Sequence, residues 1–135
     1  MVSADAAWWK AHRDALEFTG LRFGNTHDFQ NLPQVEKLNA PSGLNSGLLG
    51  IMAAVKLGAN KVLLLGFDLH SPGQHFFGQH PKPLKSTPPD RMKVFHKQFA
   101  GYHPRGVDII NCTPGSALDC YPKDTLENCL SALTV

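Results

Sequence analysis

The sequence predicts a three-layer α/β domain, in which helices cover a mainly parallel sheet in a Rossmann-like arrangement. Short apolar runs alternate along the chain with segments of helical periodicity. The run VLLLGF at 62–67 is continuously apolar, which is typical of a parallel strand covered on both faces. The segments between successive runs are long enough for right-handed crossovers. With 135 residues, the chain is expected to form a single domain.

The composition argues against several classes of partner. A net charge of +2 with 18% charged residues gives no electrostatic field suited to nucleic acid or an anionic membrane. The longest apolar run, around 48–57, is interrupted by Gly50 and Lys56 and is too short to cross a bilayer. The three cysteines lack CxxC spacing, which favours reduced thiols over a disulfide framework. We therefore expect a cytoplasmic protein with no nucleic-acid or membrane partner.

The N-terminal segment is expected to contain one helix and two weak strands. Residues 4–17 carry Ala, Trp and Leu at helical spacing, and Asp5 could cap this helix. Of the two adjacent tryptophans, one is expected in the core and the other near its edge. Short strands are indicated at 21–24 and 35–39, with a polar stretch between them that is typical of a loop.

The central part predicts a buried helix followed by a buried strand. From Leu44 to Leu57 nearly every residue is apolar or small, so the helix should be buried on most sides, and GAN at 58–60 supplies a glycine to end it. The strand at 62–67 follows directly. Residues 69–90 contain five prolines and three histidines without periodicity, which predicts a long structured loop of a kind that is often functional.

The C-terminal part completes the alternation of helices and strands. The segment DRMKVFHKQFAGY at 90–102 has apolar residues three and four apart, which predicts an amphipathic helix capped by Asp90. A strand is expected at 107–111 and a closing helix at 123–133.

The entrance of the central helix is the first candidate binding site. Ligands of open α/β sheets bind beyond the carboxyl ends of the strands, near helix N-termini. Backbone N–H groups and the helix dipole there could bind a phosphate or carboxylate through Ser42, Asn45, Ser46 and Gly47. The alternative is that Asn45 or Ser46 only caps the helix. Neither GxGxxG nor GxxxxGK[ST] occurs, so no dinucleotide or Walker motif is indicated.

The ends of the two apolar strands provide the other candidates. At the end of 62–67, Gly66 and Phe67 could let a ligand approach the backbone, and Asp68 could bind ribose hydroxyls or support a catalytic group. Asp68 could equally be a simple turn residue. After the strand at 107–111, a polar turn offers ligand contacts or ordinary turn chemistry through Asn111, Thr113 and Ser116.

Three histidines recur every five residues at His70, His75 and His80. Imidazole is a common zinc ligand, but no accompanying Cys, Glu or HExxH spacing completes a ligand set. One histidine acting as a general base is the stronger interpretation, and packing or surface roles are expected for the others. We therefore assign no metal ligand and no cofactor. Cys112 has no activating partner in the sequence, and His96 and His103 are expected to be solvated.

These residues carry a resemblance to known families. The stretch NSGLLGIMAAVKLGANKVLLLGFDLH resembles a block shared by bacterial family 42 sialyltransferases and by motility-accessory proteins related to archaeal hydroxymethylpterin pyrophosphokinases. Together with HFFGQHP, FHKQF and IINCTPGSALDCYP, it most closely resembles phage-borne proteins sometimes labelled norphogenetic, whose activity is unproven. The resemblance covers about residues 43–122.

The resemblance implies a function for this edge. In the sialyltransferases it binds a cytidine sugar nucleotide, and a histidine deprotonates the acceptor hydroxyl without a metal. Ser46 and Gly47 would then face the donor, while Gly66 and Asp68 would border the nucleotide. The catalytic histidine would be His80 or His75.

The chain departs from the sialyltransferase pattern at two places. The tyrosines that assist the leaving phosphate are replaced by Phe76 and Phe77, and no Gly-x-Gly-Pro-Ser turn precedes Trp8. We therefore expect this chain to be the C-terminal part of a longer protein. The sheet that this chain forms would then lack its N-terminal strand. The exposed edge of such a sheet would favour self-association into a homo-oligomer or pairing with the missing segment.

Together these observations predict nucleotide or sugar-nucleotide binding by a glycosyltransferase-like phage or prophage protein in the cytoplasm of a bacterial host. Two alternatives remain open. One is a non-catalytic phage assembly or host-interaction domain, and the other is a histidine-loop metal-binding protein.

Overall fold

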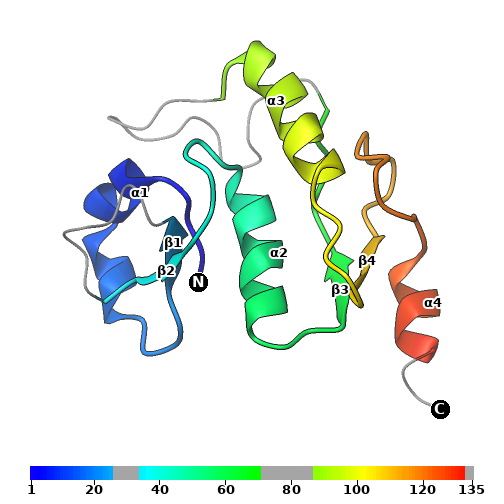
Figure 1. The fold of residues 1–135 in the computed structure, drawn as a ribbon, viewed down its shortest axis with the longest axis horizontal. Helices are drawn as coiled ribbons and strands as arrows, with labels where there is room; N and C mark the ends of the chain where they lie inside the picture. Colours follow the sequence, from blue (N-terminus) through cyan, green and yellow to red (C-terminus); the bar gives the residue numbers. More distant parts are fainter. Residues whose placement is uncertain (26–33, 71–86, 133–135) are drawn as a thin grey trace. The chain divides into compact units, whose positions relative to one another are not determined.

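The computed structural model describes residues 1–25, 34–70 and 87–132, which divide into two compact units (Figure 1). The first contains the described residues of Met1–Lys56, and the second contains those of Leu57–Gly73 and Thr87–Val135. Each unit combines helices with a pair of parallel strands, so the α/β class is confirmed. The strands of the described ranges form two two-stranded sheets, β1–β2 and β3–β4.

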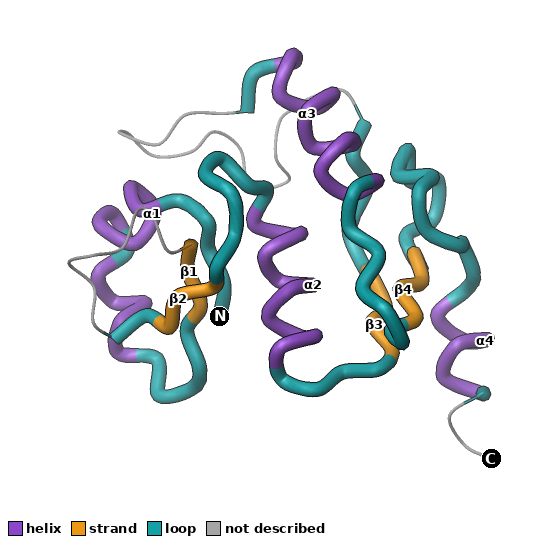
Figure 2. Tube along the Cα trace, in the orientation of Figure 1, coloured by secondary structure: helices purple, strands orange, loops and turns teal. Residues whose placement is uncertain are grey.

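Helices and strands alternate along the chain from β2 onward, whereas α1 is followed by η1 and β1 is followed by β2 among the described elements (Figure 2). The first unit contains α1 (Ala6–Ala11), the 3-10 helix η1 (Arg13–Glu17), β1 (Phe23–Asn25), β2 (Glu36–Leu38) and α2 (Ser46–Lys56). The second unit contains β3 (Lys61–Leu64), α3 (Pro89–Ala100), β4 (Asp108–Asn111) and α4 (Leu126–Ser131).

The helix predicted at 4–17 is divided into α1 and η1. Asp5 caps α1 as predicted, because its carboxylate accepts a first-turn backbone N–H at 2.8 Å. The α-helical hydrogen bonding ends at His12, whose φ and ψ of −112° and 67° are not helical. The Arg22 guanidinium then donates to the carbonyls of Leu16 and Phe18 at the end of η1. These bonds satisfy carbonyls that a helix terminus leaves without partners.

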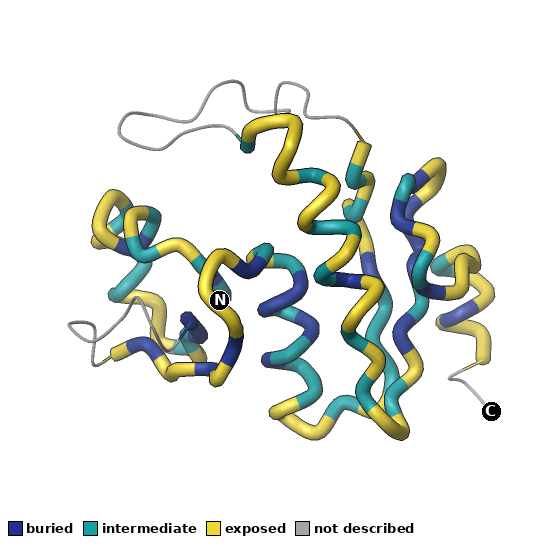
Figure 3. The backbone as a smooth tube through the Cα atoms, turned by 45° about the horizontal axis from the view of Figure 1, so that its top comes forward, coloured by how far each residue is buried: buried dark blue, intermediate teal, exposed yellow. Residues whose placement is uncertain are grey.

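The core of the first unit is built around Trp9. This side chain is fully buried against Val35, and its indole N–H donates to the carbonyl of Ser3 at 3.2 Å. Trp8 is half-buried, with its ring centroid 5.2 Å from that of Trp9. The prediction of one core tryptophan and one at the edge is confirmed. Figure 3 shows buried backbone segments in both units.

In the first sheet, β1 and β2 run parallel and α2 contacts both strands. Val2 forms a parallel bridge to Phe23, so the N-terminal residues lie along β1 as well. The apolar residues that α2 buries are Leu48, Leu49, Ile51 and Ala53. Beyond its end, Gly58 has a φ of +93°, which glycine adopts most readily, as the GAN segment predicts.

In the second sheet, β3 and β4 are parallel, with Lys61 opposite Asp108 and Leu64 opposite Asn111. The strand predicted at 62–67 ends at Leu64, because Gly66 turns the chain with a φ of +74°. The expected burial on both faces is not observed in β3. Only Leu64 is buried, and the other three residues of the strand are half-buried.

Helix α3 contributes Phe99 to an aromatic cluster with residues that follow β3 and β4. Phe99 is fully buried, and its ring meets those of Phe67 and Tyr121 edge-on, with centroids 5.8 and 6.5 Å apart. The predicted cap was wrong. Pro88 occupies the N-cap position, and Asp90 lies within the first turn. Pro89 is the first residue of the helix, a position that suits proline because the N–H that it lacks would have no helical partner.

The closing helix is shorter than the predicted 123–133. Residues 122–124 instead run along the outer edge of β4, where the N–H of Asn111 donates to Pro122 at 2.8 Å and Lys123 bridges to Asn111. The Thr125 hydroxyl then caps α4 by accepting the N–H of Asn128 at 3.2 Å. Strand-like pairing at Asn111 therefore delays the start of the helix.

Most of the loop predicted at 69–90 lies outside the described residues, and so do His75 and His80. Across the ranges that are described, none of the helices has the length and apolar character needed to span a bilayer.

Candidate functional site

The carboxyl ends of β3 and β4 meet in a turn held together by the side chain of Asn111. This amide is 1% exposed. Its nitrogen donates to the Ser116 hydroxyl at 2.9 Å and to the carbonyl of Leu118 at 3.1 Å. Its oxygen accepts the N–H of Thr113 at 3.1 Å. The amide thus fixes both ends of the turn that follows β4.

Two hydroxyls join this turn to the end of β3. The Thr113 hydroxyl accepts the N–H of Phe67 at 2.9 Å and lies 3.4 Å from the carbonyl of Leu64, to which it donates. The Ser116 hydroxyl donates to the carbonyl of Phe67 and accepts the N–H of Leu118 at 3.0 Å. The two strand ends are therefore connected by side chains as well as by the sheet.

These bonds use all the side-chain protons of the turn. An asparagine amide has two protons to donate and each hydroxyl has one. The donations of Asn111, Thr113 and Ser116 all go to groups within the protein. Their expected ligand contacts remain a prediction, and a ligand that needed those protons would have to displace an internal bond. The role that the geometry gives these three residues is to stabilise the turn.

The segment that follows β3 is more exposed than the turn that follows β4. Apart from its chain neighbours, no atom of the described residues would lie within 4 Å of a Cβ placed on Gly66, so these residues leave the backbone there open. Asp68 is exposed, and its carbonyl accepts the N–H of Ala117 at 2.8 Å. Its carboxylate has no partner among the described residues. An anchored backbone with a free carboxylate is suited to accept hydrogen bonds from ligand hydroxyls.

His96 on α3 lies beside this strand end. Its Nε2 is 3.0 Å from the carbonyl of Leu69, and because a carbonyl only accepts, Nε2 carries the proton. In the neutral ring, Nδ1 then keeps its lone pair. Leu69 has a φ of +47°, the only positive value at a non-glycine residue in the described ranges. Such backbone strain of about 1–3 kcal/mol is concentrated at functional sites.

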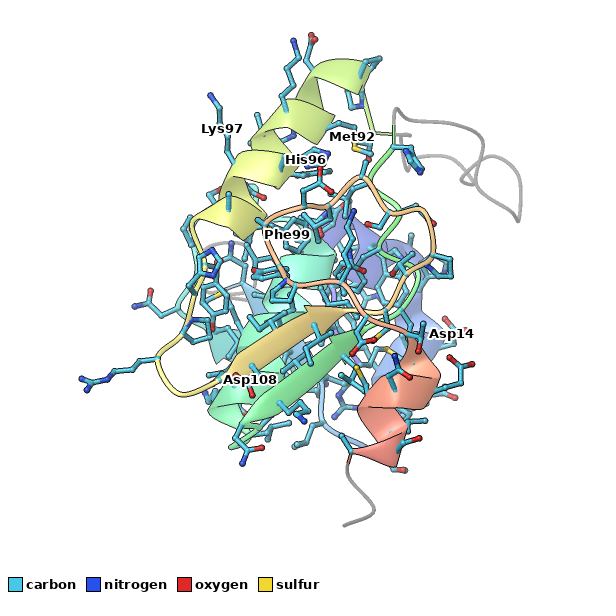
Figure 4. The ribbon with its side chains drawn as sticks, turned by 90° about the vertical axis from the view of Figure 1, so that its right-hand side faces the viewer. Asp14, Met92, His96, Lys97, Phe99 and Asp108 are labelled. Carbon is cyan, nitrogen blue, oxygen red and sulfur yellow. The ribbon has the colours of Figure 1, made fainter. Side chains whose placement is uncertain are left out.

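His96 is not among the predicted site residues, because it was expected to be solvated. It is half-buried, and Figure 4 shows it with Phe99 on the side of α3 that faces the turn after β4, whereas Lys97 points away. Its four-residue spacing from Met92 was a signal that it lies on the packed side of the helix.

Asp119 and Lys123 add an ion pair near His96. The Lys123 ammonium donates to the Asp119 carboxylate and, at 2.7 Å, to the carbonyl of Ser116. The hydrogen bond and the charge of Lys123 lower the pKa of Asp119. Asp119 therefore stays ionised below the usual pH range of aspartate. The pair places both charges at the far end of the turn.

The predicted residues of the first unit are at the start of α2. The Asn45 carboxamide oxygen accepts the N–H groups of Gly47 at 2.8 Å and Leu48 at 3.4 Å, so Asn45 caps the helix. The Ser46 hydroxyl accepts the N–H of Ala4 at 3.0 Å. Ser42 is exposed. The N–H groups of Gly47 and Leu48 therefore already have a partner. The expected proximity of Ser46 and Asp68 stays a prediction, because the two residues belong to different units.

Asn25 has a structural role that the sequence analysis did not predict. It ends β1, is fully buried, and donates from its amide to the carbonyl of Pro41 at 2.7 Å. It therefore holds the segment that leads to α2. A polar residue at the end of an otherwise buried strand could have indicated this role, because buried polar side chains are hydrogen-bonded.

No protein-family model matches the chain, and no significant match was found among curated proteins or solved structures. Within the residues that the structure describes, no cluster of three or more His, Cys, Asp or Glu side chains could bind a metal ion. The chemistry of the edge has to be inferred from its own residues.

A separate groove of about 340 Å³ lies beside β4. It is lined by residues 107–110 together with His103, Pro104, Tyr121 and Pro122. The hydroxyl of Tyr121 lies 3.0 Å from the carbonyls of Phe99 and Tyr102, and burial raises the pKa of this phenol. No predicted site residue lines the groove, so the carboxyl edge remains the better candidate.

Proposed function

We propose that the chain binds a nucleotide or sugar nucleotide at the carboxyl edge of β3 and β4, as a glycosyltransferase-like phage or prophage protein. One observation carries the proposal. Asp68, with a carboxylate that no described residue binds, directly precedes Leu69, whose carbonyl orients His96. A hydrogen-bond acceptor and an oriented imidazole thus lie at the end of one strand, where α/β sheets bind ligands.

The roles follow from the chemistry of each group. Asp68 accepts hydrogen bonds from the sugar hydroxyls, and the open backbone at Gly66 allows close approach. His96 offers the Nδ1 lone pair to the proton of an acceptor hydroxyl. In the transfer, that oxygen bonds to the anomeric carbon as the bond to the nucleotide phosphate breaks. His75 and His80 remain alternative bases.

The proposal includes a Rossmann-like three-layer domain in which both strand pairs belong to one sheet. It is supported by the parallel direction of both pairs, by α2 between β2 and β3 in the sequence, and by α3 between β3 and β4. Nuclear Overhauser contacts between backbone amides of the two pairs test this arrangement, and their absence would contradict it.

The binding test is a titration of the chain with cytidine, uridine and guanosine nucleotides, followed by amide chemical shifts. We expect saturable shifts at Gly66 and Asp68 with at least one of them, and loss of these shifts in Asp68→Asn. Asp108→Asn is the matched control, because Asp108 is also exposed but begins β4 at the opposite end of the sheet. Equal effects of both substitutions, or no response to any nucleotide, would refute the proposal.

A non-catalytic assembly or host-interaction domain is the second candidate. It is favoured by the internal use of every side-chain proton of Asn111, Thr113 and Ser116, which is typical of a purely structural turn. Exposed Met1, Phe18 and Leu21 in the first unit offer apolar surface for self-association. Light scattering over a concentration series tests for a homo-oligomer. A stable oligomer without any nucleotide response would favour this second function.

A further inference from the structure

Two cysteines that are distant in the sequence face each other in the second unit. Cys112 directly follows β4 and Cys129 lies in α4. Their sulfur atoms are 3.7 Å apart, and both residues are buried, with exposed fractions of 5% and 4%. Cys120, the third cysteine, is half-buried and has no thiol partner in the described residues. The fold therefore creates one close pair of thiols.

Both members of the pair are held in place by backbone contacts. The N–H of Cys112 donates to the carbonyl of Leu64 at 2.9 Å, and the N–H of Cys129 donates to the carbonyl of Thr125 at 3.2 Å. A disulfide needs its sulfur atoms about 2 Å apart, and a separation of 3.7 Å already brings them close to that distance. The two thiols are thus arranged to form a bond within one chain.

The surroundings keep the pair reduced until the site opens. Burial, the neighbouring Cys129 thiol and the charges of Asp124 and Glu127 together raise the pKa of Cys112 to about 11. Few thiolates therefore form there at neutral pH, and thiolates are the reactive species. Helix α4 has only six residues, most of them exposed, and such short peripheral helices open readily. Opening of α4 would expose Cys129 to solvent.

We propose that Cys112 and Cys129 form a reversible disulfide that fastens α4 to the turn after β4, with a small-molecule disulfide such as oxidised glutathione as the oxidant. When α4 opens, the Cys129 thiolate attacks the oxidant, a mixed disulfide forms, and one glutathione thiolate leaves and takes up a proton. When α4 closes, the Cys112 sulfur loses its proton and displaces the second glutathione. Two thiols are oxidised and one glutathione disulfide is reduced to two glutathione thiols.

This bond would restrain the candidate site, because Cys112 lies between Asn111 and Thr113 in the turn that joins the strand ends. Oxidation should lower the opening rate of α4, because the helix can then unfold away from the second unit only if the turn after β4 moves with it. The inference does not depend on nucleotide binding. It depends only on the geometry of the second unit.

The test uses the full chain with Cys120→Ser, which removes the thiol outside the pair. The folded protein is incubated with oxidised glutathione and then analysed by intact mass and peptide mapping. We expect the mass of two hydrogen atoms to be lost, with one peptide pair linking Cys112 to Cys129. Reduction with a dithiol should restore both free thiols. Amide exchange in α4 should slow by about tenfold or more in the oxidised form, since opening of the helix is restrained.

A second variant separates the internal bond from simple thiol modification. With both Cys120→Ser and Cys112→Ser, Cys129 should stop at the mixed disulfide and keep one glutathione. The same incubation in denaturant provides the other comparison, because the fold no longer brings the thiols together. Glutathione adducts without a link in the folded protein, or equally fast linking in denaturant, would overturn the proposal.

Discussion

Replacement of Asn111 by alanine should destabilise the second unit by about 2–4 kcal/mol. The side chain is buried, and it alone satisfies the N–H of Thr113 and the carbonyl of Leu118 among the described contacts. A buried polar group left without a partner costs about 1–3 kcal/mol. Two such groups give about 2–6 kcal/mol, and the exposed neighbours Pro114 and Gly115 admit water that reduces the loss to the lower half of this range.

The assay is urea denaturation followed by circular dichroism, with amide exchange at Cys112 as a local measure, because that N–H bonds to Leu64 across the strand pair. Both tryptophans lie in the first unit and therefore do not report on this turn directly. Asn128→Ala is the matched control. Asn128 is exposed on α4, and its amide donates to the Asp124 carboxylate. Its replacement should therefore change the free energy of unfolding by no more than about 0.5 kcal/mol. A loss below about 1 kcal/mol for Asn111→Ala would refute the structural role of this amide.

Three further predictions concern single contacts. Asn45→Ala should cost about 1 kcal/mol in urea denaturation because α2 loses its cap, whereas Asn45→Ser should retain most of it. Tyr121→Phe should cost about 1 kcal/mol, and in the unaltered protein an absorbance titration should show this phenol ionising only above its ordinary value of 10.0. Because Lys123 lowers the pKa of Asp119, the stabilisation from this pair should be complete above the ordinary value of 3.8 and lost as the pH falls through the lowered one. An NMR titration of Lys123→Gln should show a higher Asp119 pKa, and an unchanged value would exclude this cause.

Local patterns predicted the elements because their signals are contained in neighbouring residues. Asp5 has a carboxylate of the right length to cap the turn that follows it, and Gly58 takes the positive φ at the end of α2. The boundaries were less predictable. The helix expected from residue 123 starts later, since residues 122–124 pair with β4, and no local pattern encodes a contact with a distant strand.

The amino-acid sequence by itself determined the α/β class, the order of the helices and strands, and the positions where polar residues follow apolar strands. Only the tertiary structure decided what those polar residues do. Asn111 and Ser116 stabilise the turn, Asp68 keeps a carboxylate that no described residue binds, and His96 is oriented by the carbonyl of Leu69. The physical reason is that a hydrogen bond depends on where distant backbone groups lie, and this is fixed by the packing of the strands and helices.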